Sequence, residues 1–141
     1  MTLSSLWNTQ QLELESITTL ESQLQQRQNL VAIGQRYTDI VWAAGLFEGE
    51  GCIHLKTDRP NQRVLSIGMT DKDVMERFVD VVGYGNLKGP YISELRKPFW
   101  KWQLYKGTEV LRILKMLLPH FGNRRSAKAI EAINHLNEII N

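Results

Sequence analysis

Residues 42–51 read Trp-Ala-Ala-Gly-Leu-Phe-Glu-Gly-Glu-Gly, within an apolar run that begins at Ile40 and predicts a short helix. Gly45 and Gly49 lie four residues apart, on one face of that helix, where each glycine costs about 1 kcal/mol relative to alanine. Such glycines are useful where a second backbone must come very close. The stretch therefore predicts close packing of this helix against another backbone.

Glu50 follows the second glycine, at the C-terminal end of the predicted helix. The helix dipole disfavours a carboxylate at this end, and a bound cation would offset that unfavourable interaction. Two copies of the helix packed about a twofold axis would bring two Glu50 side chains together. The resulting oxygen-rich pocket would suit Mg²⁺.

The chain has 141 residues, 43% of them hydrophobic and 23% charged, which fits one globular domain with an appendage. Cys52 has no second cysteine for a disulfide, as is usual in a reducing compartment. The sequence contains no run of ~20 apolar residues and no basic patch followed by an apolar run at its start. We expect an intracellular protein that is not secreted and has no membrane partner, in the cytoplasm or nucleoid of a bacterium or phage-infected cell, or in an organelle.

Composition changes near Thr38. Residues 1–38 carry three acidic and two basic side chains, and the rest of the chain carries 12 acidic and 15 basic ones. The net charge of +2 averages these segments and says little about partners. We therefore predict an N-terminal helical extension of unknown role, residues 1–37, and a domain of residues 38–141 whose first helix starts at Thr38 and Asp39.

Within the extension, Ile17, Leu20, Leu24 and Val31 follow at helical spacings of three, four and seven residues. The pattern predicts an amphipathic helix that packs on the domain or frays in solvent. A coiled coil is disfavoured because the apolar spacing persists over too few heptads.

Beyond residue 51, two strands and one or two helices alternate. The predicted strands are 52–56, 62–70, 86–93, with an interruption at Pro90, and 99–105, and the predicted helices are 73–82, 109–118 and 126–140. Hairpins with helices between them predict an α+β domain, in which helices cover one face of a four-stranded antiparallel sheet.

The predicted sheet has one apolar and one polar face. The polar face carries His54, Lys56, Gln62, Ser66, Gly68, Asn86, Lys88, Lys101, Gln103 and Tyr105. Such side chains suit phosphates and base edges of nucleic acid. An antiparallel sheet also commonly has a polar face that only meets water, so both interpretations stay open at this point.

The nonamer AAGLFEGEG, residues 43–51, resembles the motif of the LAGLIDADG homing endonucleases, with Glu48 and Glu50 at the acidic positions. The order of elements, the Gly83-Tyr84-Gly85 turn and the Leu118-Pro119 break followed by basic residues also fit that family from about Thr38 onward. The resemblance implies an αββαββα domain whose sheet forms a saddle on double-stranded DNA. It further implies a homodimer, because only one copy of the motif is present.

The resemblance also implies the residues of the site. Glu50 and the carbonyl of Gly49 would bind Mg²⁺, or another divalent cation such as Mn²⁺, with no further small-molecule cofactor. Catalysis would use Glu50, Asp71 near the attacking water, and Arg124 at the phosphate. The expected dimer contacts are Val41, Gly45, Glu48 and Gly49. The expected DNA contacts are His54, Lys56, Gln62, Ser66, Lys88, Arg96, Lys97, Lys101, Gln103 and Arg125.

The sequence departs from the family pattern at two kinds of position. Both acids are Glu where the motif has Asp, and Arg124 stands where the family has lysine, which keeps the charge but is a poor proton donor. The first hypothesis is a metal-dependent, site-specific DNA endonuclease used in intron homing. The alternatives are a non-cleaving nucleic-acid binder, such as a transcriptional regulator or RNA-splicing maturase, and a monomer whose resemblance is accidental.

Overall fold

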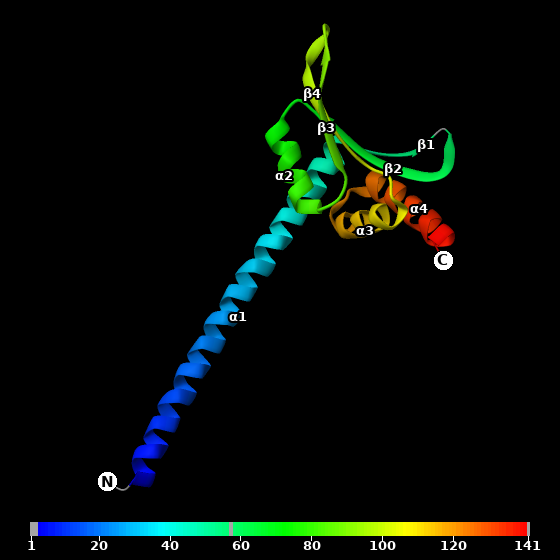
Figure 1. The fold of residues 1–141 in the computed structure, drawn as a ribbon. Helices are drawn as coiled ribbons and strands as arrows, with labels where there is room; N and C mark the ends of the chain where they lie inside the picture. Colours follow the sequence, from blue (N-terminus) through cyan, green and yellow to red (C-terminus); the bar gives the residue numbers. More distant parts are fainter. Residues whose placement is uncertain (1–2, 57, 141) are drawn as a thin grey trace. The chain divides into compact units, whose positions relative to one another are not determined.

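The computed structural model describes residues 3–56 and 58–140, and the chain forms two compact units, residues 1–38 and 39–141. Figure 1 shows helix α1 and the strands and helices that follow it in sequence order. Within the described residues, no helix is both long enough and apolar enough to cross a membrane.

Helix α1 runs from Leu3 to Glu50, so the predicted helix start at Thr38 and Asp39 is wrong. Thr38 Oγ1 donates a hydrogen bond to the carbonyl of Gly34, 3.0 Å away and one turn earlier. A threonine that bonds back to its own helix in this way does not act as an N-cap. The extension is thus helical, as predicted, and its helix continues into the motif.

The second unit contains the predicted order of strands and helices. Its elements are β1 (Gly51–Lys56), β2 (Arg59–Met69), α2 (Lys72–Val82), β3 (Asn86–Ser93), β4 (Arg96–Leu104), α3 (Gly107–Leu117), the short 3-10 helix η1 (Leu118–His120) and α4 (Asn123–Ile140). The four strands form one antiparallel sheet in the order β1-β2-β4-β3. The predicted α+β class and the four-stranded sheet are confirmed.

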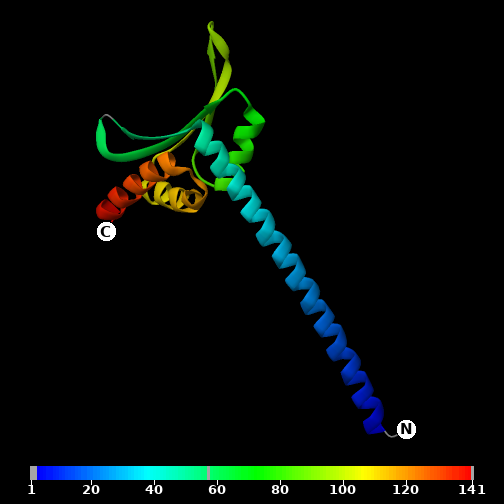
Figure 2. The same ribbon diagram turned by 180° about the vertical axis from the view of Figure 1, so that it is seen from behind.

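Helices α2, α3 and α4 lie against one face of this sheet, as the two opposite views show (Figures 1 and 2). Ile53, Leu65 and Leu104 form one row across β1, β2 and β4 on that face, and all three are buried. Trp102 is fully buried and meets the ring of Phe78 from α2 edge-on, with 4.9 Å between centroids. The predicted apolar face therefore forms the core, and the polar face is left uncovered by helices.

The turn after α2 depends on glycine. Gly83 has φ +78° and Gly85 has φ +97°, a region that side chains disfavour. At Gly85 a Cβ would overlap the indole of Trp102, whose Nε1 donates a 2.8 Å hydrogen bond to the carbonyl of Tyr84. The two glycines let this turn close over the buried indole.

Two hairpin details differ from the sequence predictions. Strand β4 begins at Arg96, so Arg96 and Lys97 lie in the strand instead of the hairpin loop. Strand β3 continues through Pro90, and the predicted interruption is only a shift in pairing between Lys88 and Tyr91. Prolines are tolerated in strands at such irregular positions.

Candidate active site and nucleic-acid interface

The motif part of α1 has two distinct faces. Ala43, Ala44 and Phe47 are fully buried in the core, whereas Gly45 and Gly49 are exposed. Val41 is exposed too and continues the same face one turn earlier, so three of the four predicted dimer contacts form an exposed row at four-residue spacing.

The exposed glycines of the motif are not required by the chain itself. A Cβ built on Gly45 or Gly49 meets nothing within 4 Å, whereas at Gly51 it would lie 2.5 Å from the carbonyl oxygen of Phe47. Gly51 is therefore explained by packing at the start of β1. Nothing in the described part of one chain explains the helix-propensity cost of Gly45 and Gly49.

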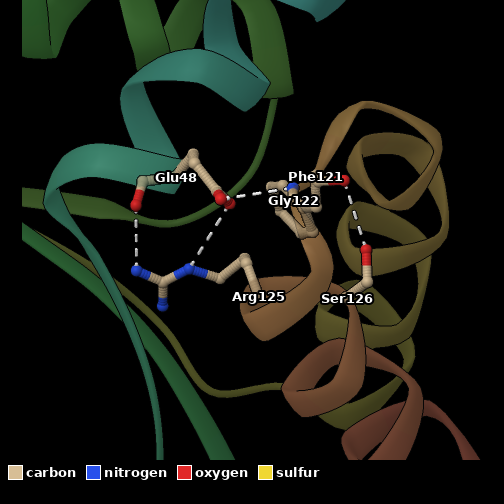
Figure 3. A network of polar contacts seen from close by, with 5 residues as sticks. All are labelled: Glu48, Phe121, Gly122, Arg125 and Ser126. Carbon is tan, nitrogen blue, oxygen red and sulfur yellow. Dashed lines mark hydrogen bonds and ion pairs between the residues drawn. The ribbon is translucent and has the colours of Figure 1, made fainter.

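Glu48 connects the end of the motif helix to the start of α4 (Figure 3). Its Oε1 accepts a hydrogen bond from the backbone N–H of Gly122 at 3.2 Å, and its Oε2 lies 3.9 Å from Nε of Arg125. Arg125 also donates from Nη2 to the carbonyl of Glu48 at 3.1 Å. At Gly122 a Cβ would lie 2.7 Å from Oε1, so a larger residue there would shift the carboxylate.

These contacts change the predicted roles of two residues. The guanidinium of Arg125 packs 5.3 Å from the ring centroid of Phe47 and binds Glu48, so contacts within the chain compete with the predicted DNA contact. The carboxylate of Glu48, predicted at the dimer interface, is used for contacts within the chain. Both side chains instead fix the end of the motif helix against α4.

A polar hollow of about 420 Å³ adjoins this connection. Its lining consists of Glu48, Gly49, Gly51, Cys52, Ile53, Arg124, Arg125 and Lys128. The hollow thus brings together Gly49, a predicted metal ligand, and Arg124, a predicted catalytic residue, with Glu48 and Arg125 beside them. It also contains Lys128, which the sequence analysis missed although it lies four residues after Arg124 on one helix face. Two exposed cations beside the first turn of α4 favour an anion.

Glu50 is the last residue of α1, and its side chain is exposed. Its carboxylate makes no hydrogen bond or ion pair with any described residue, in contrast to Glu48. Asp71 precedes α2, is exposed, and makes no capping hydrogen bond with its side chain. Asp71 does not line the hollow, so the structure does not bring it together with Arg124.

The oxygen atoms near the end of α1 can be compared with the ligands that a divalent cation needs. Carboxylate and carbonyl oxygens from Glu50 and Gly49 have the hard character that Mg²⁺ prefers. However, three acidic, His or Cys side chains do not come together anywhere in the part of the chain that the structure describes. One chain therefore fits half of a metal site, which further oxygens from outside the chain would have to complete.

The uncovered sheet face carries its polar residues in rows. Cys52, Ser66, Gln103 and Asn86 pair across all four strands, and Gly68, Lys101 and Lys88 form the next row. The register thus places four predicted DNA contacts on one face.

Comparison with solved structures identifies the fold. The homing endonuclease I-CvuI, solved with the I-CreI target in 2 mM Mg with the DNA not cleaved, matches with a TM-score of 0.60 at 17% identity, over 76% of this chain and 71% of I-CvuI. This is the LAGLIDADG homing endonuclease fold. The LAGLIDADG meganuclease I-AabMI, bound to uncleaved DNA, matches with a TM-score of 0.57 at 21% identity, over 72% of this chain and 37% of that one. The archaeal intron-encoded I-Vdi141I, complexed with DNA, gives 0.53 at 15% identity, over 71% and 67%. No family model and no curated protein matches the sequence.

Within this LAGLIDADG fold, two residues of the polar face have a different environment from the one predicted. Ser66 is buried between its neighbours, 8% exposed, so its short side chain is a poor candidate for base contact. Gln62 donates from Nε2 to the carbonyl of Tyr105 at 3.4 Å, which engages part of its amide.

The cations on this side of the LAGLIDADG fold are exposed at the strand ends. Lys56 lies with its Nζ 6.0 Å from the ring centroid of Tyr105, and Arg96 lies 5.2 Å from that of Phe99. Such contacts orient a cationic side chain while its charge stays in solvent. Lys97 is exposed beside Arg96, so both stay available to a phosphate backbone.

His54 lies on the edge strand β1, where it pairs with Val64 of β2. Burial, followed by the positive charge of Lys101, lowers the pKa of His54 below its ordinary value. The imidazole is therefore neutral at pH 7, and its Nδ1 has no hydrogen-bond partner among the described residues. His54 can thus offer hydrogen bonds to a ligand without adding charge.

Neighbouring arginines of α4 allow a matched test of these roles. We expect Arg125→Ala to lower the free energy of unfolding by about 1–3 kcal/mol, because it leaves the partly buried Glu48 without its cation. Arg124→Ala, at an exposed side chain, is expected to change it by less than about 0.5 kcal/mol. Urea unfolding measures both, and equal effects would contradict the assignment.

Proposed function

We propose that this protein is a metal-dependent, site-specific double-strand DNA endonuclease that acts as a homodimer. The observation that carries the proposal is the exposed carboxylate of Glu50, which pairs with none of the described residues. Its neighbours Gly49 and Gly51 line the hollow that contains Arg124 and Lys128. The LAGLIDADG fold and the DNA in the I-CvuI and I-Vdi141I structures support the substrate class.

The homodimer explains the glycines that one chain does not need. Packing Gly45 and Gly49 against the same residues of a second copy lets two helix backbones approach closely. A twofold axis along this contact brings two Glu50 carboxylates together at the helix ends. The second copy would thereby supply the oxygens that one chain lacks.

The proposed site needs few protein groups. Glu50 and the carbonyl of Gly49 would hold a divalent cation such as Mg²⁺ or Mn²⁺. Such a cation, when bound, stabilises charge on phosphate and leaving oxygen and lowers the pKa of a water nucleophile. Arg124 would neutralise the phosphate, and Asp71 would accept a hydrogen bond from the water. Hydrolysis adds that water to phosphorus and releases the sugar oxygen as a hydroxyl, without a covalent enzyme intermediate.

The polar sheet face would hold the DNA. The contacts that we retain are His54, Lys56, Gln62, Lys88, Arg96, Lys97, Lys101 and Gln103. Cations at the strand ends would bind phosphates and so position the duplex. Gln103, on the inner strand β4, and His54, on the edge strand β1, would contact base edges, where a good bidentate contact is worth about 1–3 kcal/mol.

Cleavage of a library of duplexes with randomised sequence tests the proposal. Incubation with 5 mM Mg²⁺, followed by recovery of cut molecules, is expected to enrich one long, nearly palindromic target, and EDTA is expected to abolish cutting. Tight, salt-sensitive binding of an enriched target without scission in Mg²⁺ or Mn²⁺ would instead favour the non-cleaving binder. The absence of both cutting and enrichment would refute the nuclease and the binder alike.

A further inference from the structure

The first unit presents an apolar stripe that the chain leaves exposed. The exposed fractions of Ile17, Leu20, Leu24 and Val31 are 52%, 64%, 57% and 72%. Helices in proteins owe most of their stability to the packing of such a stripe, and a lone helix in water is marginal. A covering partner is therefore expected along this part of α1, which is blue to cyan in Figure 1.

The spacing of the stripe matches a two-stranded coiled coil. In a heptad frame, Ile17, Leu24 and Val31 occupy a positions and Leu20 a d position, and β-branched residues at a with leucine at d favour parallel dimers. From the sequence alone, a coiled coil is disfavoured because the apolar spacing persists over too few heptads. The structure supports the pairing in another way, because α1 is helical over the whole of the stripe and the stripe is exposed.

Counted along the sequence, the same frame reaches the motif. It passes Gly34 at d and Thr38 at a, then Val41 at d and Gly45 at a. A Cβ on Gly34, as on Gly45, meets nothing within 4 Å, so this mid-helix glycine also has no explanation within the chain. If Gly34 and Gly45 each contact the same residue of a second copy, the two helices must run parallel. In an antiparallel pair, a residue faces its own copy only where the twofold axis crosses the helices.

The charges along the stripe permit pairing with an identical helix. The flanking e and g positions from residue 16 to residue 35 are Ser16, Glu21, Gln23, Gln28, Leu30 and Gln35. Only one of them is charged, so two copies meet little repulsion there, and glutamines can bond across the seam. Arg27 occupies a d position, where its aliphatic stem can cover the seam while the charge reaches water. A polar residue at one core position fixes register at some cost in stability.

We propose that residues 17–38 form a parallel, in-register coiled coil with the same residues of a second copy. This inference rests on the proposed homodimer for its direction. The extension would thus add a second dimer contact, one that is independent of DNA. It would raise the concentration of one motif helix near the other before a target is bound.

Cysteine cross-linking of the full chain tests the arrangement. In a Cys52→Ser background, we expect Leu24→Cys, at an a position, to give disulfide-linked dimers on mild oxidation. Ser22→Cys, at the outward f position of the same helix turn, is the matched control and should give at least tenfold less. In a 1:1 mixture of Leu20→Cys and Leu24→Cys chains, preferential mixed dimers would indicate antiparallel helices and overturn the proposal.

A second variant separates this inference from the proposed endonuclease dimer. Leu20→Glu with Leu24→Glu is expected to weaken association at least tenfold in sedimentation experiments, while the far-UV spectrum of the second unit is retained. If Gly45→Leu dissociates the protein but Leu24→Cys links no better than Ser22→Cys, the coiled coil is refuted and the motif dimer stands. If Leu24→Cys links selectively but Gly45→Leu has no effect, the coiled coil stands and the motif dimer fails.

Discussion

Replacing Glu50 with glutamine is expected to lower the rate of DNA cleavage at least ~10³-fold, because the change removes the only carboxylate that each chain contributes to the proposed metal pocket. The substitution keeps the size of the side chain and removes its charge. The side chain is exposed and unpaired within the described structure, so the fold should be unaffected. Single-turnover cleavage of the selected target in Mg²⁺ measures the effect.

Two controls make the Glu50 result specific. Glu138→Gln makes the same chemical change at an exposed position of α4, and we expect full activity. Target binding by Glu50→Gln in Ca²⁺ should equal that of the unaltered protein within about 0.5 kcal/mol, since sheet contacts carry the affinity. Undiminished cutting by Glu50→Gln would refute the proposed active site.

Replacing Gly45 with leucine is expected to weaken dimerisation at least ~100-fold. Overpacking a tight contact costs about 1–3 kcal/mol, and twofold symmetry applies that cost twice. The same change should leave the folded monomer intact, because a Cβ at Gly45 meets open space and leucine favours a helix more than glycine does. Sedimentation velocity and urea unfolding, measured together, separate association from stability.

Ala127→Leu is the matched control for Gly45→Leu. It adds a leucine at an exposed position of α4, outside the glycine face, and should leave association unchanged. Gly45→Ala provides an intermediate step, with partial dissociation and a monomer that is more stable by up to about 1 kcal/mol. A protein whose molar mass is the same with glycine, alanine or leucine at this position would contradict the motif-helix interface.

Local periodicity accounts for what could be predicted of the fold. Alternation along strands 52–56 and 86–93 and helical spacing over 73–82 depend on neighbours in the sequence, so the element types and the two sheet faces were predictable. The glycine pattern of the motif was visible for the same reason. Helix and strand ends were less predictable, because Thr38 can cap a helix or bond back within one.

The candidate site depended more on contacts between distant segments. Arg124 and Arg125 are equivalent in the sequence, yet only Arg125 meets Glu48, because adjacent helix positions point about 100° apart. Ser66 is polar by type but is buried by neighbours from β1 and β4, which no local pattern contains.

The sequence by itself determined the alternation of strands and helices, the acidic end of the motif helix and the glycine face suited to close packing against a second helix. Tertiary structure distinguished the two acids, since Gly122 and Arg125 engage Glu48, whereas Glu50 pairs with no residue that the structure describes. It also gathered Gly49, Arg124 and Lys128 around one hollow. The physical reason is that hydrophobic periodicity and helix or strand propensity depend on neighbours along the chain. Burial, pairing and shared cavities arise between distant segments, and the partners of Glu48 lie more than 70 residues away in the sequence.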